Sequence, residues 1–455
     1  MEITLIVSLV IVLALFFDFT NGFHDTANAM ATPIATGALK PKVAVLLAAI
    51  LNLVGAFLST EVAKTISGGI INEGDGGVLI TPELIFAGLI GAIVWNLLTW
   101  LYGLPSSSSH ALFGGLIGAA LVGAGVGAIN FGGVLSKVII PALAAPLTAG
   151  LVAFVATKIA YAITRRHDGR KDGRGHFRFA QIASSSLIAL AHGTNDAQKT
   201  MGVITLTLVA AGTQAPGTGP QLWVIVACAL AIAIGTYSGG WRIIRTLGAG
   251  LTQVKPAQGF AAETSTAATI LASSHLGFAL STTQVASGSV IGSGLGRRGS
   301  SVRWRTVGRI ALGWLFTLPS AAIVGALAAL LAQGLGTTGV IIDAVLGLLF
   351  ILFIFWRSSR NKVDHSNAIN VPDVAESGYA VRIRKRGKVK PVPTETGTIP
   401  PLTPIAKSAV RSDHAARAAE QAADDAERQI RAVERAAIRT NERAARAAGD
   451  EENDK

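Results

Sequence analysis

The sequence predicts an all-α, polytopic membrane protein built from two inverted-topology repeats, with broken helices and re-entrant-like hairpins. Three observations lead to this fold class. Half of the 455 residues are hydrophobic, only 15% are charged, and the mean hydropathy is +0.51. Long stretches carry almost no charge, and a membrane-spanning helix needs about 20 such residues. Two polar motifs each occur twice, at nearly the same spacing.

The apolar stretches divide the chain into parts. The first stretch is interpreted as a retained span because it lacks a basic start, contains Asp18 and has no cleavage site before the polar residues that follow. Apolar segments are expected at 3–38, 43–60, 84–102, 108–125, 137–164, 180–211, 222–241, 260–280, 284–296, 306–332 and 338–356. The predicted parts are a first transmembrane repeat (1–164), a basic cytoplasmic loop (165–178), a second transmembrane repeat (179–356), a flexible basic and proline-rich linker (357–405), and a cytoplasmic helix and tail rich in Ala, Arg and Glu (406–455).

The net charge of +12 has its origin in a few basic loops and in the tail. Membrane proteins retain such loops in the cytoplasm, so the pattern predicts orientation and not nucleic-acid binding. It places the N-terminus outside and the C-terminal tail on the cytoplasmic side of the membrane. The single Cys228 excludes an internal disulfide.

Internal repetition is the third observation. "GFHDTANAM" (22–30) aligns with "GTNDAQKTM" (193–201), and "PSSSSHALFGGLIG" (105–118) aligns with "ALSTTQVASGSVIG" (279–292). The expected path crosses the membrane an odd number of times in the first copy, so the second copy is inverted. Inverted repeats with interrupted helices are typical of secondary transporters, whose sites lie near the middle of the bilayer.

The first motif places carboxylates where ionised groups are costly, so they should face the protein interior and have partners there. Gly22 and Gly193 precede the two clusters and are expected to break their helices, which would offer backbone carbonyls to a cation. A cluster of helix-packing hydrogen bonds is the alternative. The candidate residues for cation or proton coupling are His24, Asp25, Asn28, Asn195, Asp196 and Lys199.

Two of these candidates have specific expected roles. His24 adjoins Asp25, and an imidazole there can titrate near physiological pH. Lys199 follows Asn195 by one helical turn and is expected to neutralise Asp196 or to attract an anion.

The second motif places hydroxyl side chains at predicted helix starts. A helix start directs free N–H groups and a positive dipole end toward an anion. Ordinary N-capping and small-residue packing are the alternative. In the second copy Gln284 replaces His110 of the first. The candidate residues for binding a tetrahedral oxyanion are Ser106, Ser107, Ser108, Ser109, Ser281, Thr282, Thr283 and Gln284.

These four motifs resemble the duplicated signatures of the PiT inorganic phosphate transporters, over about residues 1–356. The resemblance implies symport of inorganic phosphate with protons or sodium. In bacterial members the substrate is often a neutral metal–phosphate complex moved with protons. His24-Asp25, where many members have Asn-Asp, resembles that bacterial low-affinity branch. A divalent metal would then be part of the substrate, and neither a resident cofactor nor a metal site of the protein's own is expected.

Other functions were weighed against this one. A sulfate permease of the same architecture is the nearest alternative, because sulfate is also a tetrahedral dianion. A passive channel is a second. An intramembrane metalloenzyme is a third, but the sequence contains no HExxH, no GxSxG and no zinc-type cysteine spacing, so no enzyme is predicted. A homodimer stays open. The enzyme alternative would use His24, Asp25, His192 and Asp196.

Overall fold

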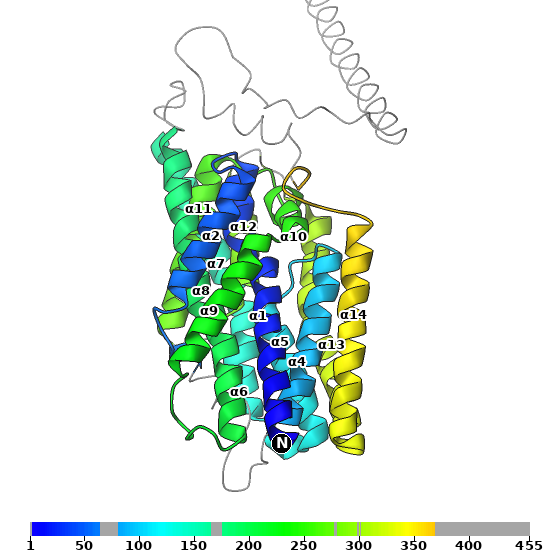
Figure 1. Ribbon diagram of the computed structural model, residues 1–455. Helices are drawn as coiled ribbons and strands as arrows, with labels where there is room; N and C mark the ends of the chain where they lie inside the picture. The colour runs from blue at the N-terminus through cyan, green and yellow to red at the C-terminus, as the bar shows by residue number, and fades with distance from the viewer. Residues whose placement is uncertain are drawn as a thin grey trace, which may run out of the picture. The chain divides into compact units, whose positions relative to one another are not determined.

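The computed structural model describes residues 2–63, 81–164, 175–276, 280–297, 300 and 302–368. Within these residues the regular secondary structure is helical, joined by turns and short connections, with one isolated bridge between Thr252 and Val302 (Figure 1). The expected basic loop lies outside the described residues up to 174, and residues 175–178 already belong to a helix. The expected linker and tail lie outside them from residue 369 on.

Helices of the first half match the expected apolar segments. A short helix and a π-helical turn (Leu135–Ile139) precede the last of them and were not expected. The helices are α1 (Glu2–Ala35), α2 (Pro41–Gly55), α4 (Pro82–Leu101), α5 (Ser108–Gly123), α6 (Phe131–Val134) and α7 (Ile140–Thr164).

Helices of the second half also match their expected segments. The second helix of this half bends by 55° into a short, unexpected one. The helices are α8 (Gly175–Ala210), α9 (Leu222–Ser238), α10 (Trp241–Arg245), α11 (Pro256–His275), α12 (Thr282–Gly296), α13 (Trp304–Leu335) and α14 (Thr337–Ser359).

The expected helix breaks at Gly22 and Gly193 are wrong, because α1 and α8 run through both positions without interruption. These glycines instead let helices approach closely. A Cβ on Gly22 would lie 2.4 Å from the carbonyl oxygen of Ile232 on α9, and one on Gly193 would lie 2.2 Å from that of Asn52 on α2. A side chain at either position would force the backbones apart, so glycine is required for packing.

The two halves repeat the same packing with exchanged partners. α5 packs against α13 and α12 packs against α7. A Cβ on Gly114 of α5 would lie 2.4 Å from the carbonyl oxygen of Leu318, and one on Gly288 of α12 would lie 2.3 Å from that of Pro146. Gly114 and Gly288 are 174 positions apart, the spacing of the second sequence motif. Each half therefore holds the short helix of the other.

α1 and α8 lie side by side and run in opposite directions. Arg178, near the start of α8, donates a hydrogen bond to the carbonyl oxygen of Ala38, just past the end of α1. Further along, Asp25 and Asp196 lie together. Figure 1 shows α1 beginning at the end marked N, with α8 beginning at the opposite end.

Two hairpins reach into the interior. α4 is followed by α5, and α11 by α12; the second helix of each pair has 16 or 15 residues. That is shorter than the roughly 20 residues of a full span. Both short helices begin at buried residues, Ser108 and Thr282. Their N-terminal ends therefore lie inside the bundle, as a re-entrant-like hairpin requires.

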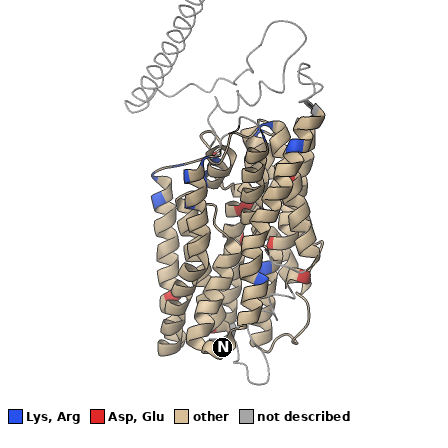
Figure 2. Ribbon diagram, turned by 180° about the vertical axis from the view of Figure 1, so that it is seen from behind, with Lys and Arg blue, Asp and Glu red and all other residues tan. Residues whose placement is uncertain are grey.

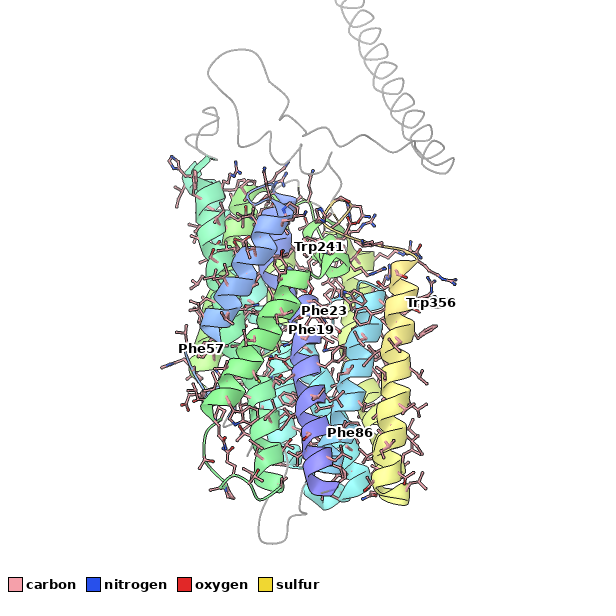
Figure 3. All side chains as sticks on the ribbon, in the orientation of Figure 1. Phe19, Phe23, Phe57, Phe86, Trp241 and Trp356 are labelled. Carbon is pink, nitrogen blue, oxygen red and sulfur yellow. The ribbon has the colours of Figure 1, made fainter. Side chains whose placement is uncertain are left out.

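Apolar side chains cover the outside of the bundle. Phe57 and Trp356 are about half exposed and project outward in Figure 3. Among the described residues, five helices are long and apolar enough to cross a membrane, or six if the bent α9–α10 pair is one span. Most Lys and Arg residues gather at the end opposite the N-terminus (Figure 2). An apolar exterior around a polar interior is the arrangement that a lipid solvent favours.

Candidate functional site

The candidate site lies where α1 and α8 pass each other, next to the starts of α5 and α12. α1 contacts α4, α8 and α12, so residues of both halves meet here. α1 contributes His24, Asp25 and Asn28, and α8 contributes His192, Asp196 and Lys199. All six side chains are buried. The structure thus brings together two sequence motifs that are 171 positions apart.

Asp25 accepts hydrogen bonds from both short helices. The hydroxyl of Thr283 lies 2.9 Å from Oδ1, and those of Thr282 and Ser108 each lie 3.2 Å from Oδ2. His24 Nδ1 lies 2.7 Å from Oδ1. The carboxylate is therefore surrounded by donors that come from three helices.

Asp196 lies between two basic side chains of its own helix. His192 Nε2 is 2.7 Å from Oδ2, and the Lys199 ammonium group forms an ion pair with Oδ1. The hydroxyl of Thr282 is 3.0 Å from Oδ2. His192 Nε2 also lies 3.7 Å from Oδ2 of Asp25, so this imidazole stands between the two carboxylates.

The amides of the two motifs do not have equivalent places. Asn28 donates to the hydroxyls of Thr282 and Thr283, at 3.3 and 3.1 Å, and so belongs to the site. Asn195 donates instead to Ser274 near the end of α11, at 2.9 Å. The structure therefore brings Asn28 to the start of α12 but directs the amide of Asn195 toward α11.

The hydroxyl residues fall into two groups. Ser107 and Ser281 are the N-caps of α5 and α12 and accept from the backbone N–H groups of His110 and Gln284. For these two residues the capping alternative describes the observed geometry. The hydroxyls of Ser108, Thr282 and Thr283 instead point at the aspartates, as described above.

The remaining polar residues extend the site on either side. Ser106 bridges the hydroxyl of Thr99 at 2.7 Å and His24 Nε2 at 3.4 Å. Ser109 donates to the carbonyl oxygen of Leu280 at 3.3 Å, and Lys199 reaches the same oxygen at 3.3 Å. Gln284 is buried, and within the described residues its Oε1 accepts no hydrogen bond.

The ligand atoms of Asp25, His192 and Asp196 all lie within 4.8 Å of one another. Two carboxylates and one imidazole at that spacing can coordinate a cation. No metal ligand was expected from the sequence, and His192 was named there for the enzyme alternative. The i,i+4 spacing of His192 and Asp196 is the signal that places both on one helical face.

A further buried carboxylate, Glu263 on α11, is not among the site residues expected from the sequence. It accepts hydrogen bonds from Thr32 at 2.6 Å, Gln181 at 2.9 Å and Ser184 at 2.5 Å. Its side chain is buried. Thr32, which donates to it, lies about two helical turns after Asp25 on α1. An acidic residue within the apolar segment expected at 260–280 was the available signal.

A helical bundle that is apolar outside and holds buried charged groups where two hairpins meet is typical of membrane transporters. A model described as the phosphate transporter family matches residues 21–325. The chain belongs to this family, and it is a multi-pass membrane transporter and not an enzyme. The resemblance seen in the four motifs is confirmed.

Related proteins agree with this assignment, and one solved structure shares the fold. A probable low-affinity inorganic phosphate transporter of Mycobacterium bovis is 57% identical over 361 residues, which are 79% of this chain and 85% of the relative. One from Bacillus subtilis is 42% identical over 332 residues, or 72% and 98% of the two chains. The solved structure titled "The sodium-dependent phosphate transporter" has a TM-score of 0.64 at 24% identity. It covers 72% of this chain and 99% of its own, which supports the fold.

Proposed function

We propose that the protein imports inorganic phosphate across the bacterial cell membrane by symport with a cation, which we take to be the proton. The observation that carries the proposal is the shared hydrogen bonding of Asp25 and Asp196 to the starts of α5 and α12. The acidic side chains and the candidate anion-binding hydroxyls form one hydrogen-bonded group. Binding of a cation to the acidic side chains therefore changes how the hydroxyls can bind an anion.

Competition for donors explains how cation and phosphate would bind together. In the structure, the hydroxyls of Ser108, Thr282 and Thr283 donate to carboxylate oxygens. A proton on Asp25 or Asp196 removes negative charge and weakens the hold on these hydroxyls, because hydrogen bonds to charged acceptors are the stronger ones. The released donors and the helix starts can then bind the phosphate oxygens. Phosphate binding is thereby favoured by protonation.

The proton is the preferred coupling ion because imidazoles contact both carboxylates. His24 lies against Asp25, and His192 lies between Asp25 and Asp196. Histidine is the side chain whose unperturbed titration falls near neutral pH. These contacts provide several neighbouring groups that can bind a proton. Sodium, which would bind the carboxylate oxygens directly, is the alternative coupling ion. The uptake experiment below distinguishes it from the proton.

The packing of the two halves supports inverted repeats and alternating access. α1 and α8 run in opposite directions, and each half holds the short helix of the other against α7 or α13. Movement of one hairpin with its partner helix would open the site to one side of the membrane at a time. Since positive residues are retained in the cytoplasm, the end opposite the N-terminus would face inward (Figure 2).

A divalent metal would enter as part of the substrate. The oxygen and nitrogen atoms of Asp25, His192 and Asp196 are spaced for one cation, and a metal bound there could also contact a phosphate held by the helix starts. A neutral metal–phosphate complex needs less charge compensation from the protein than free phosphate does. No resident cofactor is required for this cycle.

Sulfate is the competing substrate, and the carboxylates argue against it. HPO4²⁻ can donate a hydrogen bond to an ionised aspartate, whereas sulfate has no proton to donate. When one of Asp25 and Asp196 carries the coupling proton, the other stays ionised. An ionised carboxylate beside the anion would reject sulfate, because a buried acceptor left without a donor is costly. We expect excess sulfate to leave phosphate uptake unchanged.

Uptake of radiolabelled phosphate into proteoliposomes containing the purified full chain tests the proposal. The pH gradient, sodium gradient and magnesium concentration are varied separately. We expect concentrative uptake under an inward proton gradient without sodium. Uptake that follows sodium alone would reassign the coupling ion. Uptake indifferent to both gradients, or inhibited by sulfate as strongly as by unlabelled phosphate, would overturn the proposed function.

A further inference from the structure

A buried carboxylate outside the site described above is Asp18 on α1, seven residues or about two helical turns before Asp25. Its side chain is fully buried, and among the described residues neither of its oxygens accepts a hydrogen bond. Thr200 on α8 faces this carboxylate without closing a hydrogen bond to it. Among the described residues, Asp18 therefore has no ion-pair partner and no closed hydrogen bond of its own.

Other buried polar groups on α1, and on α4 which packs against it, also lack hydrogen-bond partners among the described residues. Asn21, one turn further along α1, is buried with both amide atoms unpartnered among the described residues. The same holds for Asn96 on α4, a helix that packs against α1. Cys228 of α9 faces Asp18 as well. Buried polar groups without partners call for an explanation, and an unobserved proton, ion or water is the usual one.

The charged groups near Asp18 do not supply a free positive charge to compensate it. The titratable groups facing it from the packed helices are His192, Asp196 and Lys199 on α8 and Cys228 on α9. Both basic groups are already engaged by Asp196. An ionised Asp18 would therefore be a buried charge without compensation and would repel Asp196. Such a group needs a bound positive charge to be stable at this depth.

A proton satisfies this requirement better than a metal ion. A hard cation such as calcium takes six to eight oxygen ligands, and other such ions also rely on several. The described groups that face Asp18 from α8 and α9 offer one hydroxyl, from Thr200, and one thiol, from Cys228. Even with the amide oxygens of Asn21 and Asn96, these side chains and the Asp18 carboxylate would supply fewer than six oxygens. A protonated carboxyl needs no such shell, and its O–H can donate to the Thr200 hydroxyl, which is itself unpartnered. Chemistry and geometry therefore both favour the proton.

We propose that Asp18 is a proton-binding residue of the transport cycle, separate from the Asp25–Asp196 site. This inference rests on the proposed function. In the proposed orientation, Asp18 lies between the outer face and the site. A proton taken up there from the external solution removes a negative charge that faces Asp196 and so favours the binding of phosphate. After reorientation, the proton is released to the cytoplasm.

The test compares wild type with Asp18→Asn in the same proteoliposomes. Asparagine mimics the protonated acid but cannot exchange a proton. We expect the variant to keep phosphate exchange without any gradient, but to lose stimulation of uptake by an inward pH gradient and the accompanying proton influx, which an internal pH dye reports. Asp343→Asn on α14, a buried carboxylate outside the site, is the matched control and should keep both activities.

Infrared spectroscopy tests the protonation of Asp18 independently, in case the Asp18→Asn protein misfolds or loses phosphate exchange. The infrared spectrum of the wild-type protein at neutral pH should contain the carbonyl stretch of buried, protonated carboxyl groups. This band should lose the contribution of one group in Asp18→Asn, while other buried carboxyl groups such as Glu263 remain. A band unchanged by the substitution, or wild-type proton coupling in the variant, would overturn the role of Asp18. If wild type itself shows no proton-coupled phosphate uptake, the proposed function fails instead, whereas the infrared result still reports on Asp18.

Discussion

The carboxylates of Asp25 and Asp196, which the chain separates by 171 positions, share one hydroxyl donor. The Oγ1 atom of Thr282 lies 3.2 Å from Asp25 and 3.0 Å from Asp196. One hydroxyl proton can satisfy only one of the two acceptors at a time. The start of α12 is therefore sensitive to the charge on either aspartate, which links the two halves of the molecule at their shared centre.

Asp196→Asn should abolish phosphate uptake while leaving membrane insertion intact. The substitution keeps the size of the side chain but removes the charge that pairs with Lys199 and contacts His192. Proton or cation binding at this position is then lost. The measurement is radiolabelled phosphate uptake in proteoliposomes, with monodisperse elution in detergent as the check on folding. Uptake at the wild-type rate would remove Asp196 from the coupling mechanism.

Thr282→Val should weaken phosphate transport far more than Thr282→Ser. Valine has nearly the shape of threonine but no hydroxyl, whereas serine keeps the donor that both aspartates share. Loss of a hydrogen bond to a charged group costs about 1.5–3 kcal/mol, which is roughly 10- to 150-fold in apparent affinity. The apparent KM for phosphate in wild type and both variants measures this. Equal values in all three would show that the hydroxyl does not contribute to the substrate site.

Much of the fold could be predicted because apolar segment length and repeated motifs are local properties of the sequence. Each expected apolar segment contains a described helix, and the two motifs on α1 and α8 do meet. The predicted breaks at Gly22 and Gly193 failed because a glycine's role depends on what lies opposite. Gly22 and Gly193 are needed because they contact the backbones of α9 and α2, and a local sequence pattern does not predict such contacts.

The candidate site was predictable in its residue types but not in its pairings. Asp25 and Asp196 were found because carboxylates in an apolar segment are costly wherever they lie. That Ser107 caps α5 while its neighbour Ser108 donates to Asp25 depends on side-chain direction at one turn. Likewise, Glu263 acquires its meaning from Thr32 and Gln181 on other helices. Such partners are set by tertiary packing.

Gly193→Ala should destabilise the protein, whereas Gly313→Ala on α13 should not. An added Cβ at Gly193 would lie 2.2 Å from the backbone oxygen of Asn52, but at Gly313 it would meet no atom within 4 Å. Overpacking of this kind costs about 1–3 kcal/mol, whereas alanine gains about 1 kcal/mol in a helix with open space around it. Thermal unfolding in detergent measures both. A Gly193→Ala protein as stable as Gly313→Ala would show that the α2–α8 contact is not as close as described.

Glu263→Ala should lower stability more than Glu263→Gln does. The Glu263 carboxylate accepts hydrogen bonds from Thr32, Gln181 and Ser184, which come from two other helices. Alanine leaves these buried donors without their acceptor, at about 1–3 kcal/mol for each group that finds no other partner. Glutamine keeps one acceptor oxygen, and its amide can donate to a serine or threonine hydroxyl that has turned to accept. Unfolding temperatures in the same detergent rank the three proteins. Equal destabilisation by alanine and glutamine would show that an acceptor oxygen at this position does not hold α1, α8 and α11 together.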